Sequence, residues 1–493
     1  MAKIPYEAFV GDSAKMRSSR FNDSRTINMY LEANESVSPA KGKQPAVLLS
    51  VPGKTLRFDS GISSGVRGMW QPSSNPGVAF VVIGNVVFKI APGTDAGGLF
   101  NSTILMSGTL NSSTGQVSIS DNGLQVFMVD GQDGYWWDIG GDTVNLVTDV
   151  HFHPASTVDY LDGRFVFNHV GTTECFFSDI NAVTFSELNT FRKTSSSDNV
   201  IGIKVNVGQI YLFGEKNTEV WYNQGSTESV FLPYARVQGK YIPFGCCAPL
   251  TIQTLNGTIV WLGKSIDGKG VVYTLDADNP TRVSTHAVEF DIQRVTDLSQ
   301  AHAYTQQIDG HMFYCLQIPE LDKTWCFDLL KPNWHERQTC RDGFFGRDRA
   351  NNHMLFNGEH IVGDDQTGKL FVLDFDTYTD GEYPLVRIRQ APHLVNDLDR
   401  VRYNKLEVDF MFGVGTPTEF SANPVAVLNI SDDGGMTFGP DLEVSIGAIG
   451  DYQVRAQWWQ LGMSTDRVFR VTISDPVNVQ MLSAVLDITP CNS

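Results

Sequence analysis

The sequence predicts an all-β protein in three parts: an extended N-terminal arm at residues 1–60, a six- or seven-bladed β-propeller-like domain at 61–385, and a C-terminal β-sandwich at 386–493. Two observations carry this prediction. Glycine turns recur at nearly even spacing, each beside a β-rich run. Alternating apolar residues occur throughout, whereas long stretches with helical spacing of apolar residues are missing.

The recurring turn is clearest in "LNGTIVWLG" at residues 255–263, where Asn256-Gly257 precedes a β-branched and aromatic run. Such a pair favours a tight hairpin, because both central residues of the turn need positive φ. Related turn glycines lie 39 to 53 residues apart, at Gly84, Gly123, Gly163, Gly208, Gly257, Gly310 and Gly358. A repeat of this length is the size of one four-stranded propeller blade.

The rest of each unit agrees with a blade. A short alternating stretch precedes the turn, and an aromatic third strand such as "YWWDI" or "TWCFDL" follows it, often with a weaker fourth. A pair of β-sandwiches is the alternative, since its strands also recur at short intervals. The blade count stays open between six and seven, because the first unit has no clear third strand.

Residues 1–60 lack the repeated unit and are locally basic, with nine Lys or Arg against six Asp or Glu. The stretch "MRSSRFNDSR" holds Arg17, Arg20 and Arg25. A segment of this kind is either a solvated extended arm or a docking strip for an acidic partner. These three arginines are therefore the candidate residues for docking.

After residue 386 the alternating strands become longer, which is typical of an antiparallel sandwich. One segment of this region, "SDDGGMTFG" at 431–439, fits the S-x-D-x-G-x-T-F form of the Asp-box of sialidases and other propellers. The matching residues are Ser431, Asp433, Gly435, Thr437 and Phe438. In those families the box is a hairpin turn remote from the catalytic site, so the match predicts structure rather than glycosidase chemistry.

The formal net charge of −18 argues against broad nucleic-acid binding, because phosphate binding needs clustered Lys and Arg. A negatively charged passage would instead repel DNA and let it slide. No signal peptide or membrane-spanning apolar run is apparent, so we expect assembly in the cytoplasm and no membrane anchor. The seven cysteines are too few for a disulfide framework and are interpreted as reduced core residues.

Motifs for catalysis or metal binding are weak. "GISSG" at 61–65 fits a nucleophile pattern without its strand-and-helix context, and "PGKT" at 52–55 lacks the first glycine of a phosphate loop. His151 and His153 could share a strand face, but no carboxylate or cysteine lies at ligand spacing. Carboxylates in turns yield no acid and base pair. The sequence predicts no catalytic residue, no cofactor and no metal site.

Three short segments carry a resemblance: "INMYLE" (27–32), "LLSVPGKTLRF" (48–58) and "GVRGMW" (65–70). They are similar to the opening of the packaged-DNA stabilisation proteins of short-tailed bacteriophages, also called tail hub or nozzle proteins. The residues concerned are Asn28, Met29, Pro52, Gly53, Arg67 and Gly68. The Asp-box-like turn and the closing strand pair resemble the C-terminal end of the same family.

The resemblance implies a structural protein of the virion tail, assembled in the host cytoplasm as a homo-hexameric ring. Such a ring would lie below the portal and its adaptor protein and continue the channel for double-stranded DNA. It would help to retain packaged DNA and would bind the tail needle and a tailspike or fibre. A propeller suits this role because it is rigid and exposes only short strand edges.

A propeller glycosidase or glycan-binding receptor protein is the alternative function. It would need an acidic and aromatic cluster at the mouth of the propeller, which the sequence does not reveal. We therefore predict a non-enzymatic tail component.

Overall fold

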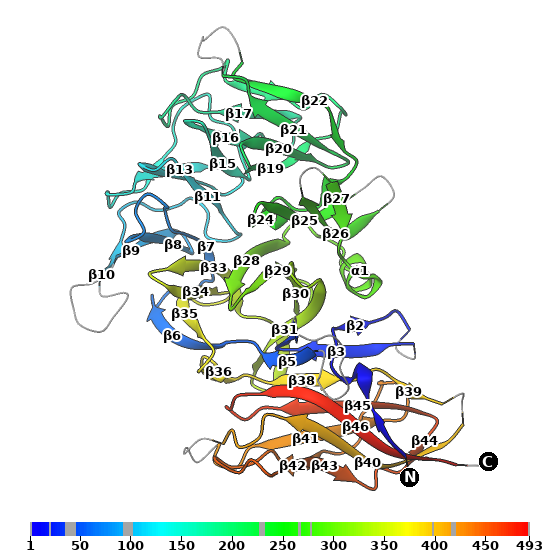
Figure 1. The fold of residues 1–493 in the computed structure, drawn as a ribbon. Coiled ribbons are helices and arrows are strands. Elements are labelled where there is room, and N and C mark those ends of the chain that lie inside the picture. Colours follow the sequence, from blue (N-terminus) through cyan, green and yellow to red (C-terminus); the bar gives the residue numbers. More distant parts are fainter. Residues whose placement is uncertain are drawn as a thin grey trace.

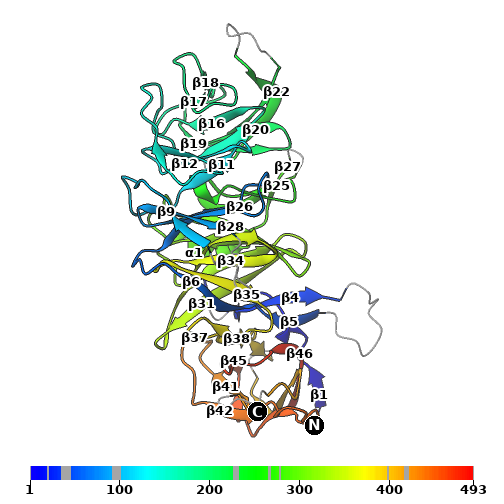
Figure 2. The same ribbon diagram turned by 90° about the vertical axis from the view of Figure 1, so that its left-hand side faces the viewer.

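The computed structural model describes residues 2–18, 21–34, 46–91, 102–225, 232–264, 268–276, 279–396, 399–415 and 421–491. Figure 1 shows two β-domains stacked end to end, with a propeller above a sandwich and both chain termini at the sandwich end. The view turned by 90° (Figure 2) shows the same stack from the side. The predicted all-β propeller and C-terminal sandwich are confirmed.

The described residues form seven propeller blades of four antiparallel strands, which decides the open blade count. The strands of the first four blades are β7 (Val66–Trp70), β8 (Ala79–Ile83), β9 (Val86–Ala91), β10 (Ser102–Leu105), β11 (Ser118–Asp121), β12 (Gln125–Val129), β13 (Gly134–Asp138), β14 (Asn145–Leu146), β15 (Val158–Leu161), β16 (Arg164–Asn168), β17 (Glu174–Phe177), β18 (Thr190–Arg192), β19 (Val200–Asn206), β20 (Gln209–Gly214), β21 (Thr218–Asn223) and β22 (Tyr234–Ile242).

The last three blades have the same four strands together with two extra strands and a helix. Their strands are β24 (Gln253–Leu255), β25 (Thr258–Lys264), β26 (Lys269–Asp276), β27 (Asn279–Arg282), β28 (His302–Ile308), β29 (His311–Gln317), β30 (Thr324–Asp328), β31 (Asn333–Arg341), β33 (Ala350–Phe356), β34 (Glu359–Asp364), β35 (Lys369–Asp374) and β6 (Gly53–Asp59). Two short strands extend blades five and six, β23 (Gly245–Cys246) and β32 (Phe344–Arg347). The helix α1 (His286–Gln293) connects these two blades.

Left-handed turn pairs separate the first and second strands of blades three to seven, as the sequence predicts. The residue before the turn glycine also has positive φ, for example 50° at Asn256 and 49° at Asp309, followed by 77° at Gly257 and 80° at Gly310. Gly84 differs, because its turn joins β8 to β9, the second and third strands of blade one. It therefore does not mark the same point of the repeat as the others.

The ring of blades is closed by the N-terminal side of the chain. Strand β6 is the outermost strand of blade seven and runs antiparallel to β35, with Gly53 opposite Asp374. Residues 53–59 therefore belong to the propeller, although the sequence assigned them to a separate arm. Pairing the two ends of the propeller sequence in one blade fixes the ring without a free edge at the closure.

The sandwich has two sheets, and strands from the N-terminal segment enter both. One sheet has the order β4-β5-β46-β40-β43 with β1 and β44 alongside, and the other continues from β3 through β38, β45 and β41 to β42, with β2 and β39 alongside. Their bounds are β1 (Ala2–Pro5), β2 (Ala14–Lys15), β3 (Asp23–Ile27), β4 (Met29–Ala33), β5 (Ala46–Ser50), β38 (Arg387–Gln390), β39 (Leu394–Val395), β40 (Val401–Phe410), β41 (Val425–Ser431), β42 (Leu442–Ser445), β43 (Ala456–Trp459), β44 (Met463–Ser464), β45 (Asp466–Ile473) and β46 (Gln480–Pro490).

The sandwich core forms because its long strands alternate buried and outward residues. Leu406 and Val408 of β40 pack with Phe469 and Val471 of β45, all fully buried. Met29 of the N-terminal segment belongs to the same cluster. The predicted extended arm at 1–60 is therefore wrong as a separate part, because its described strands complete both domains.

Strand β3 also joins the two domains directly. It pairs with β38 of the sandwich on one side and, at Ile27, with Glu336 of β31 in blade six on the other. The short strands β36 (Thr379–Asp380) and β37 (Tyr383–Pro384) lie in the segment between the propeller and the sandwich. They extend the sheet of blade seven beyond β6, because β36 pairs with β6 and β37 pairs with β36. The N-terminal segment is thus clamped between propeller and sandwich.

Candidate functional site at the junction of propeller and sandwich

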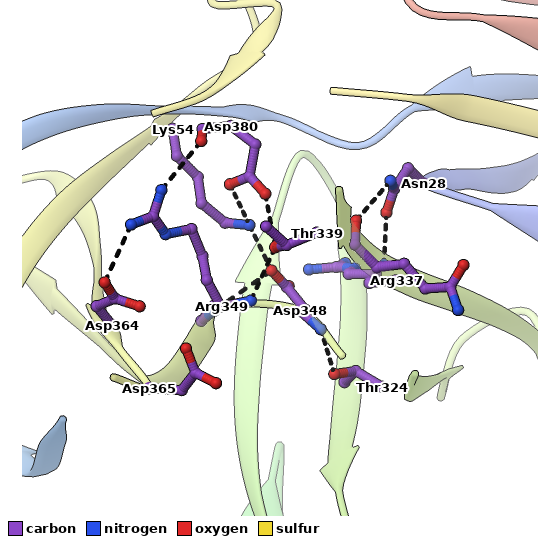
Figure 3. A network of polar contacts seen from close by, with 12 residues as sticks. Asn28, Lys54, Thr324, Arg337, Thr339, Asp348, Arg349, Asp364, Asp365 and Asp380 are labelled. Carbon is purple, nitrogen blue, oxygen red and sulfur yellow. Dashed lines mark hydrogen bonds and ion pairs between the residues drawn. The ribbon is translucent and has the colours of Figure 1, made fainter. Parts of the chain in front are cut away.

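Asn28 links the two domains from the turn between β3 and β4. Its side-chain amide donates to the carbonyl oxygens of Gln338 and Val386, each at 2.8 Å, and its carbonyl oxygen accepts from the Gln338 N–H at 2.9 Å. Asn28 has φ of 55°, which Asn tolerates better than most residues. Figure 3 shows its side chain inside the polar network of the junction. Gln338 lies in blade six and Val386 just before the sandwich, so one side chain fixes both.

Glu336 of β31 is a fully buried acid of this junction. Its carboxylate accepts from Arg25, whose Nη2 lies 2.5 Å from Oε2, and from Ser13 at 3.0 Å. Lys323 Nζ lies 3.4 Å from the same Oε2. Burial would raise the pKa of Glu336, but the charges of Arg25 and Lys323 outweigh it and lower that pKa to about 2. The group is therefore charged and paired at neutral pH.

Lys54 of β6 holds the closing strand against blades six and seven (Figure 3). Its ammonium contacts Asp348 and lies 3.0 Å from Oδ1 of Asp380, and all three side chains are buried. Burial would lower the pKa of Lys54, but the two carboxylates raise it overall. Thr339 donates to the other oxygen of Asp380 at 2.6 Å. The lysine therefore forms ion pairs with two buried acids at the closure of the propeller.

Arg349 forms two neighbouring ion pairs, of which the one with Asp364 is marked in Figure 3. Its guanidinium donates to Asp364 at 3.0 Å and to Glu382 at 2.9 Å, and it lies 4.1 Å from the centroid of the Phe371 ring. Asp365 is bound by Arg341 at 2.6 Å. Burial raises the pKa of Asp365 to about 6 despite this cation. Removing one partner of such buried pairs leaves an uncompensated charge.

Arg389 of β38 anchors the start of the chain. Its guanidinium donates to the backbone oxygens of Ala8, Phe9 and Asp12 at 3.1, 2.6 and 3.0 Å, which brings the short helical turn at Glu7–Phe9 onto the sandwich. Burial lowers the pKa of Arg389 to about 10. The arginine supplies hydrogen-bond donors to carbonyl groups that would otherwise be buried without a partner.

The six residues that carry the family resemblance have structural roles. Asn28 and Met29 are described above, and Pro52 is buried beside Gly53. A side chain at Gly53 would clash, since a Cβ there would lie 2.1 Å from the Thr377 carbonyl oxygen. Arg67 donates to the backbone oxygens of Gly84, Ser112 and Gly115, and a Cβ at Gly68 would lie 2.5 Å from Val117. The two glycines therefore allow a close approach, to backbone at Gly53 and to the Val117 side chain at Gly68.

The three candidate docking arginines have different surroundings. Arg25 is paired with Glu336 inside the chain and is not a free docking side chain. Arg17 is exposed. Arg20 lies outside the described residues. The docking prediction therefore stays open for Arg17 and Arg20.

The Asp-box-like turn lies between β41 and β42 of the sandwich. Asp433 accepts from the N–H of Met436 at 3.0 Å and of Thr437 at 2.9 Å and from the Ser431 hydroxyl at 2.7 Å. The Ser431 hydroxyl oxygen accepts from the Gly435 N–H at 2.9 Å. The hydrogen bonds from Thr437 above all lower the pKa of Asp433. The Phe438 ring lies against the Arg470 guanidinium at 3.8 Å. The Ser431 hydroxyl and the Asp433 carboxylate therefore bond within the turn, whereas the neighbouring Asp432 accepts from Arg467 of β45 at 2.8 Å.

A central channel of about 440 Å³ is lined by the inner strands of all seven blades. Among its described lining residues there is no carboxylate. Its titratable groups include Lys204, which pairs with Asp159 at 3.4 Å, and His353, whose pKa burial and the nearby His360 lower to about 3. The Trp70 ring N–H of the lining donates to Asp121 at 2.8 Å. The lining offers no pair of acids for glycoside hydrolysis.

The histidine motif at residues 151–153 forms no metal cluster among the described residues. His153 stacks on His169 with ring centroids 4.4 Å apart, not on His151. Within the described ranges no cluster of three His, Cys, Asp or Glu could hold a metal ion. Asp267, one of the carboxylates in predicted turns, lies outside the described residues. None of the described helices is both long and apolar enough to cross a membrane.

Two family models match nearly the whole chain. One is described as Bacteriophage P22 Gp10, beta-propeller, and covers residues 3–378; the other is described as Bacteriophage P22 Gp10, beta-sandwich, and covers residues 387–489. The chain belongs to the bacteriophage P22 Gp10 family. The predicted resemblance is confirmed, and this Gp10-family chain is a phage tail hub or stabilisation protein, a component of the virion tail.

Solved structures give a weaker likeness to this Gp10-family chain. YCF48 from Cyanidioschyzon merolae is 10% identical, with 66% of this chain and 99% of that chain covered and a TM-score of 0.41. The Myceliophteria_thermophila Cps50 (Swd1) beta-propeller domain is 9% identical, with 65% and 98% covered and a TM-score of 0.41. No match was found among the curated proteins.

Sequence reasoning missed the charged residues that hold the Gp10-family junction together. Glu336 and Lys54 stand in ordinary strand sequence, and Arg349 lies just before β33. Their partners lie elsewhere in the chain; Arg25 and Glu336 are 311 positions apart. The one local signal was a charged residue at a strand position that alternation assigns to the core. Such a signal indicates that the charged residue belongs to a buried ion pair, but it does not indicate which residue is its partner.

Proposed function

We propose that this protein is the subunit of a ring of six copies that continues the DNA channel below the portal and its adaptor protein. The ring helps to retain packaged DNA and carries the tail needle and a tailspike or fibre. Family membership supports the location in the tail, and the resemblance in sequence supports the copy number and the partners. Assembly takes place in the host cytoplasm.

The observation that carries this proposal is the clamp made by the N-terminal segment. Strand β6 closes the propeller, β1, β4 and β5 enter the sandwich, and β3 pairs with both domains. Separate domains in one chain usually move relative to one another unless their interface is extensive. Here buried ion pairs and shared strands join them, which suits a subunit in the wall of a pressurised tube.

The net charge sets a condition on ring formation. Six copies carry a formal charge of 6 × −18 = −108, and this self-repulsion opposes closure. Salt screens exposed charges beyond about 10 Å at 0.1 M ionic strength. The ring therefore forms on the adaptor or at raised salt, and the acidic wall repels DNA so that it passes without sticking.

A complementation experiment tests the proposal. Phage lacking this gene is grown with or without the wild-type protein supplied in trans, and the DNA content of purified particles is measured. We expect filled particles only when the protein is supplied, and empty particles with portal and adaptor when it is not. Normal retention of DNA without the protein would contradict the proposed role.

Non-enzymatic function is part of the same proposal. The central channel of the propeller has no carboxylate among its described lining residues. Purified protein should therefore not hydrolyse sialosides or host surface glycans. Turnover that survives repurification and disappears with one carboxylate substitution would favour the glycosidase alternative instead.

A further inference from the structure

Two cysteines face each other inside blade six. Cys315 of β29 and Cys326 of β30 are directly opposite in the antiparallel register, and the Cys326 thiol donates to the Cys315 sulfur at 3.1 Å. Directly opposite residues in such a pair have Cα atoms about 4.5–5.5 Å apart, which lies within the range that a disulfide spans. Both side chains are buried.

The pair belongs to a row across the blade that begins at the central channel. Tyr304 of β28 lies opposite Cys315, and His335 of β31 lies opposite Cys326. Tyr304 also lines the channel and shares a core cluster with both cysteines. A small solute in the channel is therefore separated from the thiols by the Tyr304 side chain.

A buried cation without an acid partner accompanies this row. Arg337 donates to Gln306 at 2.9 Å and to His335 at 3.2 Å, its Nη2 has no hydrogen-bond partner, and no carboxylate oxygen of the described residues lies within 4.0 Å of it. A buried charge normally requires a counter-charge. A thiolate at the cysteine pair would supply one.

The two thiols differ in acidity. Burial would raise the pKa of Cys315, but the hydrogen bond from Cys326 and the charge of Arg337 outweigh it and lower that pKa below its ordinary value. Burial, followed by the same hydrogen bond, raises the pKa of Cys326. Because the thiolate is the reactive form, Cys315 is the nucleophile and Cys326 the resolving thiol.

We propose that Cys315 and Cys326 are a built-in oxidation site, which hydrogen peroxide converts to a cross-strand disulfide in the folded protein. The Cys315 sulfur attacks one peroxide oxygen, the O–O bond breaks, and hydroxide leaves to be protonated to water. The Cys326 sulfur then attacks the resulting sulfenic acid, so that the S–S bond forms, the S–O bond breaks, and the thiol proton leaves with hydroxide as a second water. Two electrons pass from the sulfurs to the peroxide.

The disulfide would tie together two strands of the blade whose fourth strand carries Glu336. It constrains the unfolded chain and so stabilises the blade next to the junction. The inference rests on the proposed function only for the circumstance in which oxidation would happen. A virion leaves a reducing cytoplasm and enters an oxidising exterior. The chemistry of the site does not depend on it.

Peptide mapping of the full-length protein tests the proposal. Reduced protein is treated with dilute hydrogen peroxide under native conditions, alkylated in denaturant and digested for mass spectrometry. We expect a Cys315–Cys326 disulfide, a fall from seven free thiols to five, and a thermal midpoint raised by a few degrees that falls back on reduction. Full alkylation of both cysteines in protein that stays folded, or pairing of either with another cysteine, would overturn the proposal.

Two single variants test the assigned roles. In Cys326→Ser the sulfenic acid has no resolving thiol, so dimedone should label Cys315. In Cys315→Ser dimedone should leave Cys326 unlabelled. Equal labelling in both variants would contradict the asymmetry, and the wild-type mapping decides the proposal if either variant fails to fold. None of these readouts requires a ring, so their failure is distinct from failure of the proposed function.

Discussion

Asn28 and Gln338 exchange hydrogen bonds across the junction: the Gln338 N–H donates to the Asn28 side chain at 2.9 Å, and the Asn28 amide donates back to the Gln338 carbonyl at 2.8 Å. The two residues are 310 positions apart. Their contact places the turn between β3 and β4 against blade six. The junction of propeller and sandwich thus depends on the N-terminal segment.

Replacing Asn28 with Ala should lower the free energy of unfolding by about 3 kcal/mol, because buried backbone partners lose their hydrogen bonds. Chemical denaturation of the purified variant measures this. Asn256→Ala is the matched control, since Asn256 has a similar φ of 50° but is exposed in its hairpin turn. Equal losses in the two variants would mean that only backbone strain matters at Asn28.

Replacing Lys54 with Met should lower the free energy of unfolding by about 3–5 kcal/mol, because Asp348 and Asp380 would remain buried without their cation. The exposed Lys216 offers the control Lys216→Met, for which we expect a change within about 0.5 kcal/mol. Protease digestion should also release the segment around β6 earlier in the Lys54 variant. An unchanged denaturation midpoint would contradict the role of Lys54 in closing the ring.

The lowered pKa of Glu336 predicts acid sensitivity. Because the folded pKa of about 2 lies below the unfolded value of 4.5, the stabilisation is fully present above pH 4.5 and is lost as the pH falls toward 2. The difference of pKa corresponds to about 3 kcal/mol. Denaturation of wild type and Glu336→Gln across this window should give curves that converge in acid. A constant difference in stability between them would contradict the prediction.

Substitution of Val207 should stabilise the fold. It has φ of 48° in the turn before Gly208 and is 82% exposed, so a β-branched residue is strained there without compensating burial. Val207→Asn should raise the free energy of unfolding by about 1 kcal/mol. Val150→Asn is the control, at 84% exposure and without positive φ, and should change little. No gain at Val207 would count against the turn conformation.

Arg17 is the candidate for docking on an acidic partner in the tail. Arg17→Glu should weaken attachment to the adaptor while leaving thermal unfolding unchanged, because the side chain is exposed. Lys216→Glu changes charge equally on the propeller and is the control. Arg25→Glu should instead destabilise the fold, because it places a second acid beside Glu336. Normal tail attachment of the Arg17 variant would exclude this arginine from docking.

Local chemistry explains what the sequence predicts well. Asn256-Gly257 and Asp309-Gly310 require left-handed backbone, and that requirement is visible in the residues themselves. Gly84 lies in the hairpin between the second and third strands of its blade rather than the first and second, because a turn glycine is compatible with either hairpin. Long alternating strands such as β40 predicted the sandwich for the same local reason.

Contacts between distant segments could not be predicted in this way. Strand β6 pairs with β35 in blade seven, with Gly53 opposite Asp374. Neither strand has a sequence feature that indicates the other as its partner. Arg25 looks like a surface arginine in a basic stretch, yet Glu336 binds it. Periodicity reports which face of a strand is buried, but not which strand lies beside it.

Cryo-electron microscopy of the protein assembled on its portal adaptor tests the central claim most directly. The account predicts a closed ring of six copies coaxial with the adaptor, each copy with propeller and sandwich joined through the N-terminal segment, around a lumen that is not basic. Copies that stay monomeric in the presence of the adaptor, or a ring whose lumen is strongly basic, would contradict it.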